Sequence, residues 1–233
     1  MHPSALDYGK RFFETYAEPH FERVLDVGAF DVNGSLRSVC PKGLAYTGVD
    51  LVAGKGVDLV LDDPYTYPFP DNHFHMIVST SCFEHDSLFW LTFIEAIRVL
   101  APGGMFYINA PSNGIYHAHP IDCWRFYPDA GLALQEWAKR SGLEVELLES
   151  FTGERSGGDD WNDFVMIFQK SGLTDLKHVP ISSRATSIKN VRCAGKAEMD
   201  RASRLPEDLR IIVSLRNENA ELRRKIETLQ SGR

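Results

Sequence analysis

The feature that most constrains the fold of this 233-residue chain is a pair of apolar runs that each end beside an acid. Val24–Val27 contains Asp26 and leads into Gly28, and the next run, Tyr46–Val49, ends at Asp50. A strand followed by a glycine-bearing turn, with an acid at the end of the next strand, is typical of a nucleotide-binding βαβ unit. The sequence therefore predicts a ribose-bearing cofactor at the carboxyl ends of these two strands.

Strand-like runs alternate with helical patterns along most of the chain. Helical periodicity falls at 88–100, where Pro102 and Gly103 follow, and at 129–141, where Gly142 follows. Strand character occupies seven segments: 23–27, 45–50, 58–61, 74–79, 105–109, 144–148 and 164–169. This alternation predicts an α/β fold with a mainly parallel sheet that helices cover on both faces. Because no clear helix separates the last two runs, we expect the last strand to be antiparallel.

Composition narrows the class of protein. With 43% hydrophobic and 24% charged residues, the chain can build one sizeable core, and its net charge of −7 argues against nucleic acid as a partner. Its four cysteines lie far apart without a CxxC pair, so neither a zinc site nor a disulfide framework is indicated. No run approaches the roughly 20 apolar residues of a membrane span, and no leader pattern precedes the first run. We therefore expect a cytoplasmic protein without a membrane span.

We expect three parts: a globular domain at 1–171, a polar linker at 172–205 and a helix at 206–231. The helix carries a heptad pattern, with a positions Ile212, Asn219 and Ile226 and d positions Leu215, Leu222 and Leu229. Isoleucine at a with leucine at d favours a parallel dimer, an asparagine at a fixes its register, and Glu218 would face Arg223 of a second copy. The seam is short, so a helix packed on its own domain, or a frayed tail, is an equal alternative to a homodimer.

A family resemblance rests on six motifs in order. They are Asp26-Val-Gly28, Gly48-Val-Asp50, Leu61-Asp62-Asp63, Pro68–Phe74, Cys82-Phe-Glu-His85 and Arg98–Gly104. Together they resemble a class I S-adenosylmethionine-dependent methyltransferase of the type 11 group over residues 22–170. The segments Asp31–Ser35, Thr80–Asp86 and Asp122–Pro128 are further similar to a bacterial subgroup found with surface polysaccharide synthesis. The resemblance implies a Rossmann-like, doubly wound, seven-stranded, mostly parallel sheet with an antiparallel last strand, a C-terminal helical extension, and S-adenosylmethionine as cofactor, with S-adenosylhomocysteine as product.

The glycine turn departs from that family. Its usual GxGxG is reduced to Gly28, which lets backbone approach the cofactor, and a displaced Gly34. We expect a wider turn in which Phe30, Asp31 and Asn33 also line the cofactor site.

Acids after the first three strands are expected to bind the cofactor's polar groups. Asp26 can accept a hydrogen bond from the ammonium of the methionine part. Asp50, with Leu51 beside it, suits the ribose hydroxyls. Asp63, or Asp62 in its place, is positioned by the resemblance to accept from the adenine amino group, although an Asp-Pro pair also opens plain turns.

The methyl acceptor is expected over the end of the fourth strand. Thr80 and Ser81 should lie beside the sulfonium end of the cofactor, and Glu84 and His85 beside the acceptor. A base is required only if the nucleophile is a hydroxyl or a protonated amine, and His85 is one candidate.

The loop after the fifth strand is unusually rich in functional side chains. His117 or His119 could take the proton, with Asp122 orienting the imidazole. Arg125 could pair with a phosphate or carboxylate, and aromatic rings could stack on a sugar. The residues expected to bind substrate here are Asn113, Tyr116, Trp124, Arg125 and Tyr127. The His-X-His pair with Asp122 could also hold a divalent metal, but the pattern is generic and we expect none; a structural loop is the other alternative.

The expected activity is methyl transfer to a hydroxyl of a small molecule or a saccharide, such as a surface polysaccharide precursor. Amine or carboxylate methylation is the alternative within the same enzyme class. A non-catalytic, cofactor-binding scaffold in glycan assembly and a nucleotide-sugar or NAD-type enzyme are alternatives from other classes, because fold alone does not give function.

Overall fold

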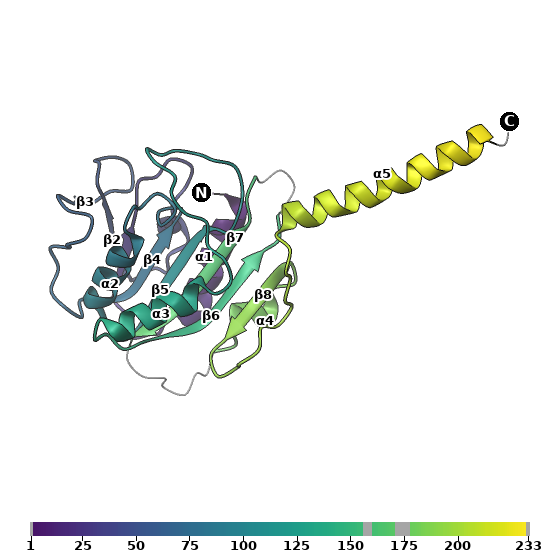
Figure 1. The fold of residues 1–233 in the computed structure, drawn as a ribbon. Coiled ribbons are helices and arrows are strands. Elements are labelled where there is room, and N and C mark those ends of the chain that lie inside the picture. Colours follow the sequence, from purple (N-terminus) through teal and green to yellow (C-terminus); the bar gives the residue numbers. More distant parts are fainter. Residues whose placement is uncertain (1, 156–159, 171–177, 232–233) are drawn as a thin grey trace. The chain divides into compact units, whose positions relative to one another are not determined.

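The computed structural model describes residues 2–155, 160–170 and 178–231. It divides into two compact units, Met1–Arg201 and Ala202–Arg233, and each is described by itself (Figure 1).

The larger unit is built on an eight-stranded sheet in the order β3-β2-β1-β4-β5-β7-β6-β8. The strands are β1 (Arg23–Val27), β2 (Ala45–Asp50), β3 (Leu59–Val60), β4 (Phe74–Thr80), β5 (Leu100–Pro111), β6 (Val145–Gly153), β7 (Asp163–Lys170) and β8 (Ile188–Cys193). Strands β1 to β5 are parallel neighbours, whereas β7 runs antiparallel to both β5 and β6. All seven predicted runs overlap a strand, and the predicted antiparallel strand is confirmed.

Helices cover both faces of the sheet, as predicted (Figure 1). They are α1 (Pro3–Tyr16), α2 (Phe89–Val99), α3 (Ala130–Arg140) and the short α4 (Ile181–Arg184), with a 3-10 turn at Leu36–Val39. Neighbouring strand residues are buried in opposite cores: Ile77 packs with α2 and α3, and Met76 with α1. A strand buried on both faces reads as a continuous apolar run, which is why these segments were visible in the sequence.

The predicted linker is corrected by the structure. Within 172–205, the described residues 178–201 belong to the larger unit. They form α4 and then β8, the eighth strand of the sheet, which runs antiparallel to β6. Residues 172–177 lie outside the described part. The buried carboxylate of Glu149 accepts hydrogen bonds from the backbone N–H groups of Ile181 and Ser182, both at 2.9 Å, and from the Tyr16 hydroxyl at 2.6 Å. A polar segment is thus fixed through its backbone, which composition does not reveal.

The second unit contains one continuous helix, α5 (Glu207–Ser231), which has no buried residue. Its heptad residues from Ile212 to Leu229 are exposed by 42% to 73% at the apolar positions. A 25-residue helix with an unburied apolar seam gains little stability from its own propensity. Among the described helices, none is both long and apolar enough to cross a membrane.

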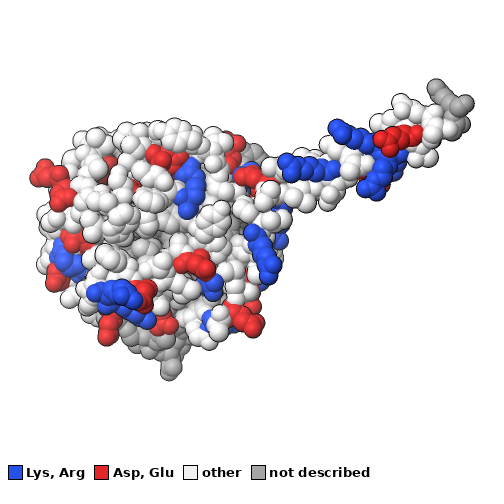
Figure 2. All heavy atoms as spheres, in the orientation of Figure 1, with Lys and Arg blue, Asp and Glu red and all other residues white. Residues whose placement is uncertain are grey.

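Charge is dispersed over the face of the molecule that Figure 2 shows. Basic and acidic side chains of the larger unit are interspersed there and do not gather into one basic patch. This distribution agrees with the net charge of −7 and gives no footprint for a nucleic-acid backbone on that face.

Candidate active site

The carboxyl ends of β1, β2 and β4 meet at one edge of the sheet because these strands are parallel and adjacent. That edge brings together the turn that begins at Gly28, the carboxylate of Asp50 and the end of β4 at Thr80. Ligands of open α/β sheets bind outside such an edge. The sequence-predicted cofactor residues therefore share one location.

The turn after β1 packs against the loop after β4. Gly28 has a φ of +81°, and a Cβ built on it would lie 2.6 Å from both the Cβ and the Sγ of Cys82. The backbone N–H groups of Gly28 and Ala29 both donate to the carbonyl of Val49 at 3.0 Å. Gly28 is thus required by the protein's own packing, and a contact with Cys82 was not foreseen from the sequence.

Asp50 is held at the end of β2 by backbone donors. Its Oδ2 accepts from the N–H of Phe30 at 3.1 Å, and its Oδ1 accepts from the N–H of Leu51 at 2.7 Å and of Val52 at 3.4 Å. The side chain is half-buried, and an ionised carboxylate has about four acceptor sites. It therefore keeps acceptor capacity for hydroxyl groups of a ligand.

The widened turn is closed by its own side chains. Asp31 accepts from the N–H of Gly34 at 2.6 Å through Oδ1, and its Oδ2 lies 2.7 Å from Nζ of Lys55. The ring of Phe30 covers Gly54, where a Cβ would lie 2.0 Å from it, while Asn33 is exposed. Asp31 therefore holds the turn together: one of its carboxylate oxygens accepts from the backbone and the other pairs with Lys55.

Asp26 is buried and faces the hydroxyl of Tyr46, which donates to its Oδ2 at 2.8 Å. Burial is the main cause that raises the pKa of Asp26 to about 7, and the bond from Tyr46 opposes it. The carboxyl group is therefore poised to ionise when a cation approaches.

The two acids after β3 differ in their contacts. Asp63 accepts from the N–H of Tyr65 at 2.9 Å and from the hydroxyl of Thr66 at 3.0 Å, which makes it the opener of a turn. Asp62 is exposed, and within the described residues no side-chain hydrogen bond or ion pair engages it. Asp62, the alternative to Asp63, is thus the acid with more acceptor capacity for a ligand.

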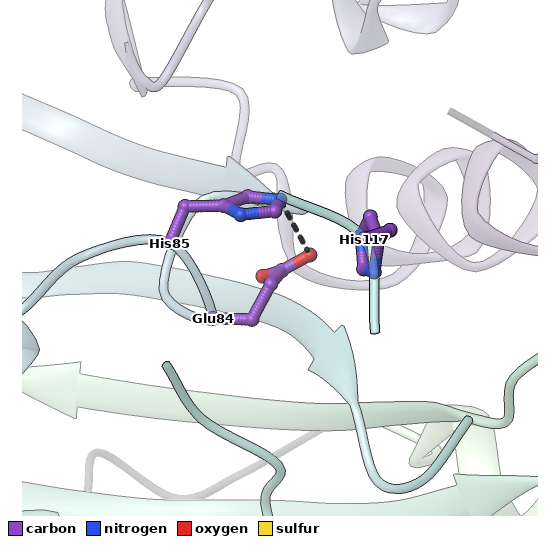
Figure 3. A group of neighbouring side chains, drawn as sticks. All are labelled: Glu84, His85 and His117. Atoms are coloured by element: carbon purple, nitrogen blue, oxygen red, sulfur yellow. Dashed lines mark ion pairs between the residues drawn. The ribbon is translucent and has the colours of Figure 1, made fainter. Parts of the chain in front are cut away.

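The loop after β4 carries the acceptor-side residues. The buried Oγ1 of Thr80 has no hydrogen-bond partner among the described residues, and Ser81 has a φ of +52°. Glu84 is buried, and its Oε1 lies 3.7 Å from Nε2 of His85 (Figure 3). Burial is the main cause that raises the pKa of Glu84 to about 8. The opposite nitrogen of His85, Nδ1, lies 2.5 Å from the carbonyl oxygen of Ile121.

The loop after β5 is organised by an ion pair. Arg125 donates to both oxygens of Asp122, at 2.5 and 2.7 Å, and to the carbonyls of Ile115 and Trp124. These contacts all lie within residues 115–125, so the guanidinium holds the loop together, while its Nε is buried without a partner in the described structure. The hydrogen bonds from Arg125 are the main cause that lowers the pKa of Asp122 to about 2.

Asp122 also contacts His117, as predicted. Its Oδ2 accepts from the backbone N–H of His117 at 2.7 Å and lies 3.4 Å from Nδ1 of that ring. Trp161, from the loop before β7, stacks on the ring with centroids 4.7 Å apart. The ring centroid of His85 lies 5.0 Å from that of His117 and 6.4 Å from that of the exposed His119. Three imidazoles thus gather beside Glu84.

Exposed aromatic rings lie on the same loop. Tyr116 and Tyr127 are 77% and 63% exposed, and Trp124 packs on Phe89 while its Nε1 donates to the carbonyl of Asp86. Asn113 accepts from the N–H of Asn162 through Oδ1. Tyr116 and Tyr127 are therefore the freest rings for a ligand, whereas Trp124 and Asn113 have structural contacts as well.

Comparison with known families identifies part of this edge. Residues 15–108 match the model of a family described as a methyltransferase domain, and the match includes the turn after β1, Asp50 and the loop of Glu84 and His85. The matched segment of the chain is thus similar to a methyltransferase domain. A search of curated proteins by sequence found no match.

Solved structures share the fold of this chain. An S-adenosylmethionine-dependent methyltransferase from Archaeoglobus fulgidus is 15% identical with a TM-score of 0.53, over 72% of this chain and 93% of the other. The 1,6-didemethyltoxoflavin-N1-methyltransferase of Burkholderia thailandensis, solved with S-adenosylhomocysteine, is 19% identical with a TM-score of 0.55, over 72% and 79%. The [4+2]-cyclase SpnF is 15% identical with a TM-score of 0.52, over 71% and 81%.

The candidate site fits S-adenosylmethionine in the chemistry of its donor set. Asp50 retains acceptor sites at the end of β2, the buried hydroxyl of Thr80 lacks a partner at the end of β4, and the absence of a side chain at Gly28 lets the loop of Cys82 pack against the turn between them. Residues that organise this site but escaped the sequence analysis are Tyr46, Lys55, Cys82, Ile121 and Trp161. Each acts through a contact with a residue distant in sequence, which a motif does not reveal even where, as for Cys82, the residue itself lies in one.

Proposed function

We propose that this protein transfers the methyl group of S-adenosylmethionine to a hydroxyl of a small molecule or saccharide, which binds beside Glu84, His85, His117 and His119. The observation that carries the proposal is the gathering of three imidazoles at the cofactor edge of the sheet. A neutral amine is already nucleophilic, whereas a hydroxyl must lose its proton during attack, so a cluster of bases favours a hydroxyl acceptor.

The cofactor would be held by residues of the first three strands. Asp50 would accept from the ribose hydroxyls, Asp26 from the methionine ammonium and Asp62 from the adenine amino group, while Asp63 stays in its turn. When bound, S-adenosylmethionine supplies a cationic sulfur that releases its methyl group: the acceptor oxygen forms the new O–CH3 bond, the S–CH3 bond breaks, and the sulfur keeps the electron pair.

His119 is the proposed base. Its ring is exposed, and within the described residues no side-chain hydrogen bond or ion pair holds it, so both nitrogens are open to an acceptor. By contrast, Nδ1 of His85 is occupied by the Ile121 carbonyl and Nδ1 of His117 lies beside Asp122. The proton of the acceptor hydroxyl would pass to His119 and then to solvent.

A saccharide is the acceptor class that the exposed rings favour. Tyr116 and Tyr127 present aromatic faces from the same loop as His119, and such rings stack on the apolar face of a sugar. The guanidinium of Arg125 is already paired with Asp122, so this arginine gives no reason to expect a charged group on the acceptor.

Labelled S-adenosylmethionine tests this proposal directly. Incubation with matched panels of sugars and nucleotide sugars, and of amines and carboxylates, should transfer label to hydroxyl acceptors. His119→Ala should lower kcat by about 10²–10⁴-fold, the usual contribution of a general base. The matched control is His178→Ala, a histidine paired with Glu18 away from the cluster. Transfer to amines alone, or a full rate in His119→Ala at every pH, would contradict the proposal.

We also propose that the protein forms a homodimer through α5. Its a and d residues form an exposed apolar seam, and Glu218 at g is complementary to Arg223 at e of a parallel second copy.

A further inference from the structure

Glu84, His85 and His117 place one potential ligand atom each within 4.8 Å of one another (Figure 3). The side chains come from two loops, one after β4 and one after β5. Unlike a cluster on an open surface, this one is sheltered: the side chains of Glu84, His85 and His117 are exposed by only 1%, 14% and 28%.

One oxygen of the Glu84 carboxyl group lacks a hydrogen-bond partner among the described residues. Its Oε2 is buried with no hydrogen-bond partner in the described structure, although a buried carboxylate normally has donors or a cation around it. Arg125 is close enough to act on Glu84 electrostatically but donates no hydrogen bond to it, because its guanidinium donates to Asp122 and to two backbone carbonyls and lies 3.4 Å from Nδ1 of His117. Glu84 therefore retains an unmet, buried acceptor atom in this cluster.

His85 is oriented as a ligand. The carbonyl of Ile121 can only accept, so Nδ1 of His85 must carry the proton and Nε2 presents a lone pair toward Glu84. A backbone carbonyl on the far nitrogen of an imidazole is the usual outer partner of a metal-bound histidine.

The separation of the two acceptors fits a shared ion. Nε2 of His85 and Oε1 of Glu84 are 3.7 Å apart, which is too long for a hydrogen bond. Two ligands that each lie about 2.1 Å from a tetrahedral ion are about 3.4 Å apart, so a small adjustment would satisfy both.

His117 is fixed as the third member. Its ring stacks on Trp161, and its Nδ1 lies 3.4 Å from Oδ2 of Asp122 and 3.4 Å from Nη2 of Arg125, which itself holds Asp122. A rigid imidazole with a carboxylate behind it resembles the second-shell arrangement of metal sites.

We propose that Glu84, His85 and His117 bind one divalent transition-metal ion, of the class that prefers imidazole with a carboxylate, with zinc as its representative. Two histidines and one glutamate leave at least one coordination position open. This site differs from the His-X-His pair with Asp122 that the sequence brought to attention, because Asp122 is engaged by Arg125 and His119 is not in the cluster of ligand atoms.

The consequence for catalysis rests on the proposed function. An acceptor hydroxyl that occupies the open position would have its pKa lowered by the ion, so that His119 could remove its proton more readily. The bonds formed and broken in methyl transfer stay the same.

Metal binding is tested on the untagged full chain after treatment with a chelator and dialysis. Titration calorimetry with Zn²⁺ should show one equivalent bound, and Co²⁺ should give the visible absorption of a low-coordinate site. Substitutions of residues that only orient a ligand typically weaken metal binding by about 10- to 100-fold. Glu84→Gln and His85→Ala should each weaken Zn²⁺ binding by more than that. Asp122→Asn should fall within the range of such orienting residues, and His119→Ala should bind Zn²⁺ like the wild type.

Folding and function are separated by a second ligand. The Glu84 and His85 variants should bind S-adenosylhomocysteine with unchanged affinity, which would show that they are folded. If the wild type bound no equivalent of Zn²⁺, or if the folded Glu84→Gln and His85→Ala variants bound Zn²⁺ as tightly as the wild type, the proposed metal site would be wrong. Zinc bound without methyl transfer to any hydroxyl would support the site and contradict the proposed function. Full transfer by metal-free protein would support the proposed function and overturn the role of the ion.

Discussion

Gly28 and Cys82 stand so close that a Cβ on the glycine would lie 2.6 Å from the Cβ of the cysteine. The contact joins the cofactor turn after β1 to the acceptor loop after β4. One glycine thereby couples the two halves of the site.

Gly28→Ala should therefore be much more harmful than the same substitution at a glycine of similar φ in open space. Its positive φ costs about 1 kcal/mol and the clash with Cys82 about 1–3 kcal/mol more, so we expect the free energy of unfolding to fall by about 2–4 kcal/mol. Gly142→Ala is the matched control, because φ is +78° but nothing lies within 4 Å of the added Cβ. Urea denaturation that gave equal losses for the two variants would refute the contact.

The roles of Asp62 and Asp63 can be distinguished with a ligand that lacks the adenine amino group. S-adenosylhomocysteine should bind more tightly than its deaminated inosyl analogue to the wild type and to Asp63→Asn. Asp62→Ala should lose this preference, which one hydrogen bond to a charged acceptor sets at about 1.5–3 kcal/mol. Preference retained in Asp62→Ala and lost in Asp63→Asn would return the role to Asp63.

The raised pKa of Asp26 makes stability depend on pH. Burial raises this pKa to about 7, compared with about 3.9 in the unfolded chain. Between these values the native protein retains a proton that the unfolded chain has lost, so its contribution to stability is full at low pH and is lost as the pH rises through about 7. Between about pH 5 and pH 7.5, the wild type should lose about 2 kcal/mol more than Asp26→Asn, which keeps an acceptor for Tyr46. Parallel pH profiles in urea denaturation would contradict the assignment.

The same residue should release a proton when the cofactor binds. An ammonium beside Asp26 favours its ionised form, so binding of S-adenosylhomocysteine near pH 6, about one unit below the raised pKa, should release up to one proton. Calorimetry in two buffers of different ionisation enthalpy measures this release. Asp26→Asn should abolish it; an unchanged release would show that the ammonium is bound elsewhere.

Much of this structure was predictable, and the exceptions have a physical cause. Strands buried on both faces, such as the one that contains Ile77, give continuous apolar runs, so the mainly parallel sheet and the position of Asp50 at a strand end follow from the sequence. Strand β8 escaped because it is held by backbone pairing with β6, and α4 before it is held by Glu149, which lies more than thirty residues away from the N–H groups that it binds. For Arg125 and Asp63 the structural roles were among the alternatives, but sequence could not choose between them and binding roles, because a free and an engaged side chain look alike in sequence.

The seam of α5 should control the number of subunits. Deletion after Leu205, or Ile226→Asp within the seam, should convert a dimer to a monomer in light scattering. Asn217→Asp, at an outward heptad position, is the control that should remain dimeric. Charge reversal at Glu218 should weaken the dimer and a second reversal at Arg223 should restore it. A wild type that is already monomeric at high concentration would rule out the dimer.

The most direct test of the whole account is a crystal structure with S-adenosylhomocysteine. The account predicts both ribose hydroxyls within hydrogen-bond distance of Asp50, the adenine amino group beside Asp62, and the sulfur facing the space in front of Glu84, His85 and His117. A ligand bound elsewhere, or one whose sulfur faces away from these histidines, would contradict it.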